Sequence, residues 1–178
     1  MSSTHREKGT YRDFYPTPRY SIEPLVRAMN WPDRPRILEP CKGTGIIIDV
    51  VTEMVPGAEF DWCEITEGRD FFAYEAPAEK FDLIITNPPF SQAQAFIDKS
   101  LTLAHCVIML LPLNYLGTQV RRDWWREVHA CYGDLYFYVL SRRPRFVNNG
   151  SDSNEYAWFV LDLGTGRVLQ DRENKWLL

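Results

Sequence analysis

The chain has 178 residues, of which 45% are hydrophobic and 25% charged, a composition typical of one globular domain that excludes a chain disordered throughout. The 20 Lys and Arg residues against 24 Asp and Glu residues leave a net charge of -4, which argues against a protein that coats nucleic acid by bulk charge. No apolar run approaches the ~18–20 residues of a membrane-spanning helix, so we expect no membrane association.

The cysteine and histidine pattern indicates no metal centre. The four cysteines lie far apart without a Cys-x-x-Cys pair, and the three histidines have no partners at metal-ligand spacing. The N-terminal residues lack the apolar core of a signal peptide. We therefore expect reduced thiols in a cytoplasmic protein that holds no metal. The cysteines are Cys41, Cys63, Cys106 and Cys131.

Short apolar runs along the chain are typical of buried strands that alternate with helices. Residues 1–10 are polar and we expect them to be flexible, which leaves residues 11–178 as one α/β domain. The strand candidates are, in chain order, 36–38, 60–65, 81–86, 106–111, 135–140 and 156–163, and the helix candidates are 46–54 and 91–103.

This alternation predicts a mainly parallel sheet with helices on both faces. The runs at 135–140 and 156–163 are rich in aromatic and β-branched residues, and a loop rich in Pro, Asn, Gly and Ser separates them. We expect these two runs to form an antiparallel pair at the edge of the sheet.

A turn that contains glycine follows the first predicted strand. Residues 37–45 read Ile-Leu-Glu-Pro-Cys-Lys-Gly-Thr-Gly and lead into the helix predicted over 46–54. Ligands of open parallel sheets bind where strands end, and glycines there let the backbone approach a ligand closely. The segment lacks a full Gly-x-Gly-x-x-Gly pattern and a following Lys-Ser/Thr pair, so by itself it also fits an ordinary strand–turn–helix connection.

Acidic residues follow the next predicted strand. Glu64 lies at its end, about 20 residues after the glycines, where an acid of this fold class accepts hydrogen bonds from ribose hydroxyls. Asp70 and Phe71 follow soon afterwards, and an acceptor beside a ring can hold an adenine by its amino group and its face. A solvated Glu and a turn before core phenylalanines explain the same residues without a ligand.

The most informative motif is Asn87-Pro88-Pro89-Phe90, directly after the strand predicted over 81–86. Such a run is rare by chance, because proline makes up only about 5% of residues. The prolines fix the backbone and carry no N–H, so the turn presents mainly acceptors, the Asn87 side-chain oxygen and the Pro88 carbonyl. Two acceptors on the donors of an exocyclic NH2 group free its lone pair for attack, and Phe90 can stack on the ring. A proline-capped loop is the alternative explanation.

Together these motifs resemble those of the amino-methylating S-adenosylmethionine-dependent DNA methyltransferases, especially the small phage-type N6-adenine enzymes. Residues 39–45 match their glycine motif, 87–90 their catalytic motif, and 14–18 (Phe-Tyr-Pro-Thr-Pro) their N-terminal cofactor motif, and the resemblance covers most of 11–163. One departure is the Cys-Lys pair at 41–42. The resemblance implies a single-domain Rossmann-like class I methyltransferase fold, with a mainly parallel seven-stranded sheet, an antiparallel C-terminal strand and no separate target-recognition domain.

The resemblance also implies a cofactor, a reaction and roles for single residues. The cofactor is S-adenosylmethionine, whose methyl group goes by direct in-line attack to N6 of a flipped-out adenine in DNA. Glu39 would face the amino group of the cofactor, Glu64 its ribose and Asp70 its adenine. The implied catalytic residues are Asn87, Pro88, Pro89 and Phe90. The implied cofactor-binding residues are Tyr15, Thr17, Pro18, Glu39, Pro40, Cys41, Gly43, Gly45, Glu64, Asp70, Phe71 and Asn87.

Two clusters that interleave cations with aromatic rings are candidate nucleic-acid contacts. One lies at 119–126 and the other at 141–146, before a loop at 148–154. A helix with a charged outer face and buried indoles is an alternative explanation of the first cluster. The second cluster is the stronger candidate, because its cations and its ring crowd a turn near the active edge. The candidate residues are Arg121, Arg122, Trp124, Arg142, Arg143, Arg145 and Phe146.

The chemistry leaves other substrates open. RNA adenine, cytosine N4 and the amide of a protein glutamine also offer an NH2 group on a planar π-system, and a non-catalytic DNA-binding subunit is a further alternative. DNA is the expected partner, in the cytoplasm of a bacterium or a phage-infected host cell, with a homodimer or a partner subunit left open. We expect short or relaxed sequence specificity, read by loops around 114–126 and 142–154.

Overall fold

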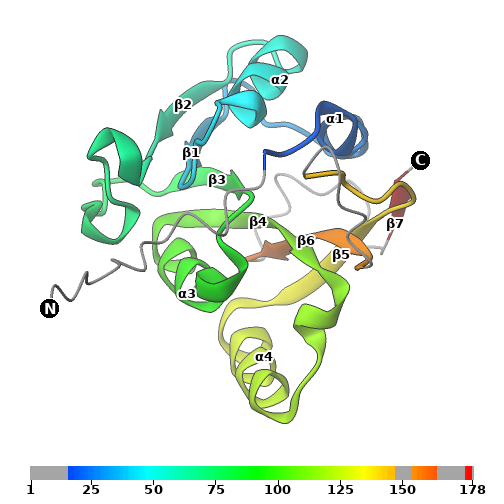
Figure 1. The fold of residues 1–178 in the computed structure, drawn as a ribbon. Helices are drawn as coiled ribbons and strands as arrows, with labels where there is room; N and C mark the ends of the chain where they lie inside the picture. Colours follow the sequence, from blue (N-terminus) through cyan, green and yellow to red (C-terminus); the bar gives the residue numbers. More distant parts are fainter. Residues whose placement is uncertain (1–15, 147–153, 164–174, 178) are drawn as a thin grey trace, which may run out of the picture.

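The structure, a computed structural model, describes residues 16–146, 154–163 and 175–177. Its strands are β1 (Arg36–Glu39), β2 (Glu59–Trp62), β3 (Phe81–Thr86), β4 (Ala104–Pro112), β5 (Asp134–Leu140), β6 (Tyr156–Asp162) and β7 (Lys175–Leu177). The described strands form one sheet in the order β2-β1-β3-β4-β6-β5-β7 (Figure 1). β6 runs antiparallel to both of its neighbours, and every other pairing is parallel.

The predicted α/β class with a mainly parallel sheet is confirmed, and so is the antiparallel pairing of β5 with β6, but this pair is not at the edge of the sheet. β6 lies between β4 and β5, and the short β7 follows it in the chain and pairs in parallel with β5. All residues of β6 are buried, which requires a neighbouring strand on each side and cover on each face. The strand predicted over 60–65 ends at Trp62, because the chain turns at Glu64, which caps a 3-10 turn at Ile65–Glu67.

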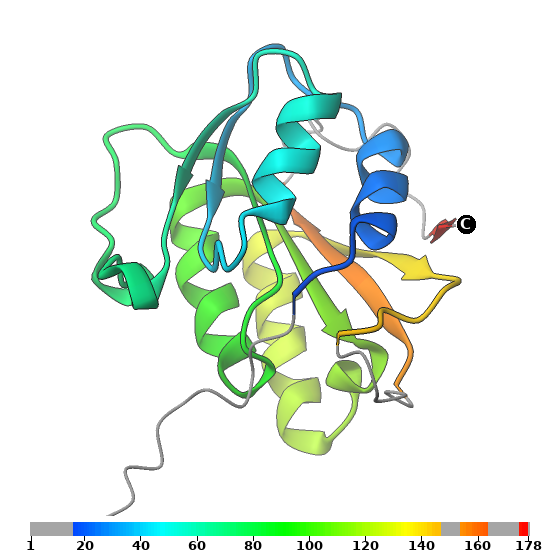
Figure 2. The same cartoon turned by 45° about the horizontal axis from the view of Figure 1, so that its top comes forward.

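Helices cover both faces of the sheet, as predicted. They are α1 (Arg19–Ala28), α2 (Ile46–Met54), α3 (Ala93–Leu103) and α4 (Gln119–Tyr132). α1 and α2 lie on one face, and α3 and α4 lie on the other (Figures 1 and 2). α2 has the bounds predicted from the sequence, whereas α1 was not predicted. Within the described ranges, no helix is long and apolar enough to cross a membrane.

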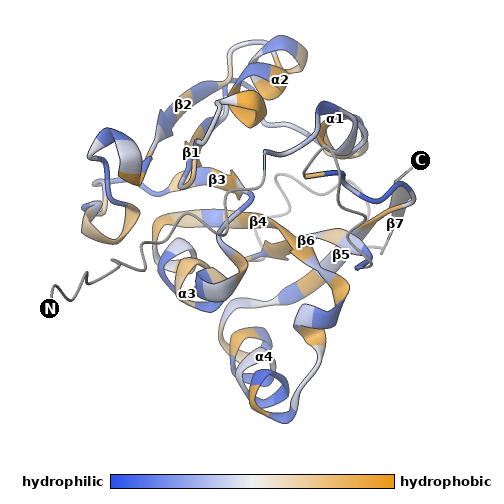
Figure 3. Ribbon diagram, viewed as in Figure 1, coloured by the Kyte–Doolittle hydropathy of each residue, from blue (hydrophilic) through white to orange (hydrophobic). Residues whose placement is uncertain are grey.

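Neighbouring residues of the central strands enter two separate hydrophobic cores, one under each layer of helices. Leu83 and Ile85 of β3 belong to the core shared with α1 and α2, whereas Ile84 between them belongs to the core shared with α3 and α4. The central strands are correspondingly hydrophobic along their length (Figure 3). Because successive side chains of a strand point to opposite faces, a continuous apolar run is the pattern of a strand that is buried on both sides.

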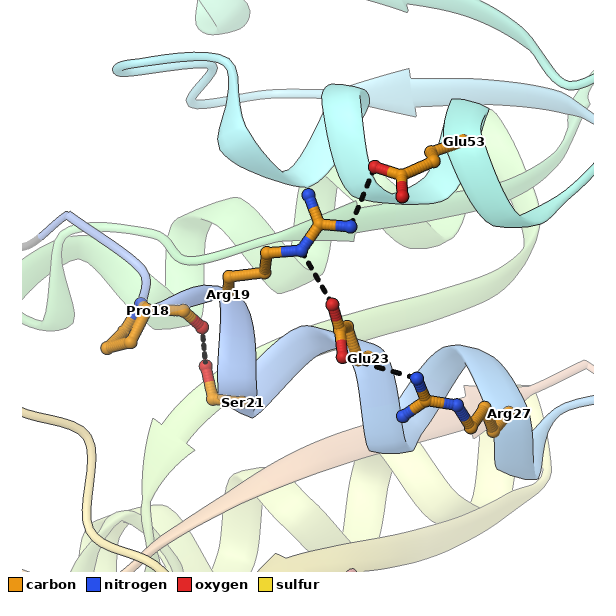
Figure 4. Close-up of polar contacts among 6 residues, drawn as sticks. All are labelled: Pro18, Arg19, Ser21, Glu23, Arg27 and Glu53. Atoms are coloured by element: carbon orange, nitrogen blue, oxygen red, sulfur yellow. Dashed lines mark hydrogen bonds and ion pairs between the residues drawn. The ribbon is translucent and has the colours of Figure 1, made fainter.

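Polar contacts fasten the first turn of α1 to its surroundings (Figure 4). The Arg19 guanidinium donates to Glu53 of α2 at 2.7 Å, and the Ser21 hydroxyl donates to the Pro18 carbonyl at 2.7 Å. The Ser21 carbonyl accepts a hydrogen bond from the indole N–H of Trp158 in β6 at 2.8 Å. The first turn of α1 is therefore held against both the sheet and α2.

We expect Trp158→Phe to lower the free energy of unfolding by about 2–4 kcal/mol, measured by urea denaturation. The indole is fully buried, and its loss leaves a cavity and removes the donor to the Ser21 carbonyl. Trp31→Phe is the matched control, because that indole donates to the Val26 carbonyl at 2.9 Å in a partly exposed position where water can replace it. Equal losses in the two variants would contradict this explanation.

Candidate active site

Three predicted site residues come from strands that end at the same edge of the sheet. Glu39 is the last residue of β1, Asn87 directly follows β3, and Glu64 lies shortly after β2. β1 and β3 are adjacent parallel strands, and the sheet continues from β1 to β2 on one side and from β3 to β4 on the other. In open α/β sheets, ligands bind in the crevice that forms at such a reversal of strand order.

Glu39 is a fully buried carboxyl at the centre of this edge. Its Oε1 accepts a hydrogen bond from the Cys41 backbone N–H at 3.1 Å, whereas the buried Oε2 makes no hydrogen bond of normal geometry with the described residues. Burial raises the pKa of Glu39 to about 8, although the nearby Thr86 hydroxyl and the Cys41 N–H act in the opposite direction. A cationic group beside Oε2 would stabilise the charged form and compensate for its lost hydration.

The glycine turn leads from β1 to the start of α2. Gly43 and Gly45 have φ values of 51° and 84°, in the left-handed region where a side chain is strained. The Gly45 N–H donates to the Lys42 carbonyl at 2.8 Å. A Cβ on Gly45 would meet no atom within 4 Å, so the backbone conformation and not crowding explains this glycine. The space beside Gly45 is therefore open to a ligand.

Glu64 joins the glycine turn to the end of β2. Its Oε2 accepts from the Gly43 N–H at 2.9 Å, and its Oε1 accepts from the N–H and hydroxyl of Thr66 at 3.0 and 2.7 Å. Burial acts to raise the pKa of Glu64, but the hydrogen bonds from Thr66 and Gly43 and the charge of Lys42 outweigh it and lower the pKa below its usual value. Glu64 is therefore a charged carboxylate that holds the two loops together.

The ammonium group of Lys42 is neutralised within the protein. It forms an ion pair with Glu67 at 2.5 Å and lies 3.8 Å from the centre of the Trp62 ring. The Arg69 guanidinium lies 4.1 Å from the same ring and pairs with Asp61 at 2.5 Å. These contacts explain how the glycine turn tolerates a cation at a position where the motif departs from its usual residues.

Asp70 and Phe71 follow β2 and differ in exposure. Asp70 is exposed, and its carboxylate accepts from the Phe72 N–H at 2.8 Å. Phe71 is buried and stacks on Phe96 of α3 with ring centroids 5.1 Å apart, so it serves the core, whereas the Phe72 ring is 42% exposed. Lys99, which was not predicted as a site residue, fixes this loop because its ammonium donates to the Phe72 carbonyl at 2.7 Å.

The Asn-Pro-Pro-Phe turn, residues 87–90, is held from the N-terminal side of α1. Nδ2 of Asn87 donates to Oγ1 of the buried Thr17 at 3.1 Å. The Pro89 carbonyl accepts from the Gln92 N–H at 2.9 Å and closes a 3-10 turn at Phe90–Gln92. Among the backbone–backbone bonds of the described turns and loops, none has the Pro88 carbonyl as its acceptor. Two predicted features thus meet in space, the catalytic motif and Thr17 of the N-terminal motif.

Phe90 connects this turn to the Arg-rich segment, residues 142–146 (Arg-Arg-Pro-Arg-Phe). Its ring centroid lies 5.8 Å from that of Tyr156 in β6 and 6.3 Å from that of Phe146, and the latter two are 5.1 Å apart. Three aromatic rings therefore link the Asn-Pro-Pro-Phe turn, β6 and the Arg-rich segment. The second of the two predicted nucleic-acid clusters lies beside the predicted catalytic motif.

The first predicted nucleic-acid cluster lies on α4, and most of its side chains contact other parts of the protein. The Trp124 indole donates to Asp98 of α3 at 2.9 Å and meets the Tyr115 ring edge-on with centroids 6.5 Å apart. The Arg121 guanidinium lies 4.0 Å from the centre of the Tyr115 ring, and Arg122 pairs with the adjacent aspartate at 3.0 Å. These contacts agree with the alternative explanation of this cluster, a helix whose indoles pack against the rest of the protein.

The other predicted site residues are placed as follows. Pro18 precedes α1, Pro40 is buried, and Cys41 is half-buried in the glycine turn. The predicted flexible segment 1–10, the predicted cofactor residue Tyr15 and residues 148–153 of the loop at 148–154 lie outside the described residues.

No protein-family model and no curated protein matches this chain. A Listeria monocytogenes protein assigned to the class I S-adenosylmethionine-dependent methyltransferases matches 95% of the chain with a TM-score of 0.62 at 12% identity. The methyltransferase subunit of a type I restriction-modification system from Streptococcus thermophilus matches 84% with a TM-score of 0.61 at 13% identity. A tRNA (m1A58) methyltransferase from Aquifex aeolicus matches 83% with a TM-score of 0.52 at 20% identity.

These similarities show that the chain has the fold of class I methyltransferases, which confirms the predicted fold class. The chain spans 67% of the Listeria protein and 70% of the Aquifex enzyme, but only 45% of the Streptococcus subunit.

Titration of Glu39 makes the ligand-free protein less stable as the pH rises. Its pKa is about 8 in the folded chain against 4.5 for an ordinary exposed glutamate, so the folded state holds an extra proton between these values. The free energy of unfolding then falls with rising pH, by up to about 1.4 kcal/mol per pH unit. We expect Glu39→Gln to remove this contribution and to gain stability relative to the unchanged protein as the pH rises through this window.

Urea denaturation at about pH 5.5 and pH 8 measures the effect as the difference between the two proteins, which cancels the titration of other groups. Glu127→Gln on α4 is the matched control, because this carboxyl is exposed. Parallel stability curves for Glu39→Gln and the unchanged protein would refute the assignment.

Proposed function

We propose that this chain is a methyltransferase that transfers the methyl group of S-adenosylmethionine to N6 of adenine in DNA. The observation that carries the proposal is the Asn-Pro-Pro-Phe turn at the end of β3, held by Thr17 at the same edge of a class I methyltransferase fold as Glu39 and Glu64. The name of the Streptococcus neighbour supports a DNA substrate, and that of the Aquifex neighbour makes RNA the substrate to test beside it.

The residues present fit S-adenosylmethionine. Oε2 of Glu39 is a buried acceptor without a hydrogen bond of normal geometry among the described residues, which suits the cationic amino group of the cofactor. Glu64 uses three of about four acceptor positions on its carboxylate, so one remains for a ribose hydroxyl. Asp70 is exposed and accessible to an adenine amino group. When bound, S-adenosylmethionine supplies a methyl group that is already activated by a positively charged sulfur.

The task of the protein is then to orient an amino group. In this proposal, the Asn87 amide oxygen and the Pro88 carbonyl accept the two N–H bonds of the target NH2 group, which leaves its lone pair directed outward. The hydrogen bond from Nδ2 to Thr17 fixes which way the Asn87 amide faces. Phe90 stacks on the ring of the target base, which must be unstacked from a duplex or single-stranded to reach it.

Incubation with S-adenosylmethionine and mixed-sequence DNA should produce N6-methyladenine, detected by mass spectrometry of nucleosides. Asn87→Ala should lower the rate by about 10²–10³-fold, as removal of one oriented polar group from an active site does. RNA in a parallel reaction tests the alternative substrate. Methylation of RNA alone or of cytosine N4 would replace DNA adenine as the substrate. Cofactor binding without methylation of either polymer would favour a protein substrate or a non-catalytic subunit.

We expect Thr17→Val to lower kcat by about tenfold, because the Asn87 amide loses its hydrogen bond to the Thr17 hydroxyl. Thr17→Ser keeps the hydroxyl and should retain most of the activity. Single-turnover methylation measures the rate, and isothermal titration measures the affinity for S-adenosylmethionine. A Thr17→Ser variant as slow as Thr17→Val, or a loss confined to cofactor affinity, would contradict the orienting role.

A further inference from the structure

The hydroxyl group of Tyr20 in α1 makes two hydrogen bonds with the backbone of the Arg-rich segment. It donates to the Arg143 carbonyl at 3.1 Å and accepts from the Arg145 N–H at 2.9 Å. These bonds join parts of the chain more than 120 residues apart, so no local pattern marks Tyr20 in the sequence. This side chain thus holds the backbone of the segment at two positions.

The ring of Tyr20 makes a further contact with the same segment. The Arg142 guanidinium lies 4.1 Å from its centre, a distance at which a cation is attracted to the face of an aromatic ring. At the other end of the segment, Phe146 is buried against Phe90 and Tyr156. The Arg-rich segment is therefore held at both ends, by Tyr20 and by the ring that follows the catalytic prolines.

The three arginines of the segment differ in their partners. Arg143 is paired with Glu155, to which its Nε donates at 2.8 Å. Arg145 is exposed, and its side chain has no ion pair with any residue that the structure describes. Pro144 and Phe146 are buried, so the exposed Arg143 and Arg145 alternate with anchoring residues. The positive charge available to a ligand is that of Arg142 and Arg145.

We propose that Tyr20 is a positioning residue that presents Arg142 and Arg145 to the phosphates of a nucleic-acid strand next to the target base. The inference rests on the proposed function. A guanidinium group binds phosphate through two parallel hydrogen bonds. This bidentate geometry forms more readily when the backbone that carries the arginine is held in place. The contact between Phe146 and Phe90 fixes the distance from these cations to the Asn-Pro-Pro-Phe turn. Tyr20 lowers the entropic cost of binding because the segment is ordered before the strand arrives.

Tyr20→Phe tests the inference, because it keeps the ring under Arg142 and removes both hydrogen bonds. We expect the affinity for a short fluorescent single-stranded DNA that contains adenine to fall about fivefold to tenfold. The slope of log K against log salt concentration should stay unchanged, since the same phosphates are contacted. Arg145→Gln should instead reduce that slope by about 0.7, the value for one phosphate contact on a single strand. The KM for DNA should rise in Tyr20→Phe, while kcat and cofactor affinity stay the same.

Tyr132→Phe is the matched control, because this tyrosine is 37% exposed at the end of α4. Its DNA affinity should equal that of the unchanged protein. Unchanged affinity in Tyr20→Phe, or a parallel loss of cofactor affinity, would overturn the positioning role. Equal slopes in Arg145→Gln and the unchanged protein would show that Arg145 contacts no phosphate and would overturn the proposal as well.

The nucleoside analysis separates this inference from the proposed function. If the protein binds DNA as described but methylates no polymer, the positioning role stands and the proposed reaction fails. If it methylates DNA adenine while Tyr20→Phe has the DNA affinity of the unchanged protein, the reaction stands and the positioning role fails.

Discussion

A carboxyl group without access to water lies where the strand order of this sheet reverses, and the hydrogen-bond donors around it offset only part of the cost of its burial. Glu39 receives one backbone N–H and lies near the Thr86 hydroxyl. Glu64 stays charged through its own hydrogen bonds, and the cation of Lys42 is matched by Glu67. This edge of the sheet therefore keeps one buried carboxyl oxygen as an acceptor for a ligand. A cationic group bound beside it would stabilise the charged form of the carboxyl.

The start of α1 holds both the Asn-Pro-Pro-Phe turn and the Arg-rich segment in place. Thr17 holds the Asn87 amide, Tyr20 holds the Arg-rich segment, and the Ser21 carbonyl accepts from Trp158 in β6. The contact between Arg19 and Glu53 fastens the same turn to α2. A shift of this helix would therefore move the Asn-Pro-Pro-Phe turn and the cationic surface together. The residues proposed to orient the target base and those proposed to face a nucleic-acid strand are thus connected through one short piece of chain.

The charges of the site are local and mostly paired, which reconciles an acidic chain with the proposed nucleic-acid substrate. Lys42, Arg69 and Arg143 each have an acidic partner among the described residues. Arg142 and Arg145 remain exposed on a segment that is ordered by Tyr20. Attraction of a strand would then act at one edge of the protein and not over its whole surface, so it depends on the position of two side chains.

The sequence alone determined the features that depend on neighbouring residues. The apolar run at 81–86, the glycine turn before α2 and the Asn-Pro-Pro-Phe turn were predictable because strand burial, positive φ angles and proline rings act locally. Only the tertiary structure decided that β6 enters the middle of the sheet and that Trp124 serves packing on α4. It alone brought Tyr20 to the Arg-rich segment. These outcomes depend on which surfaces bury each other across long stretches of chain, and no short segment carries that information.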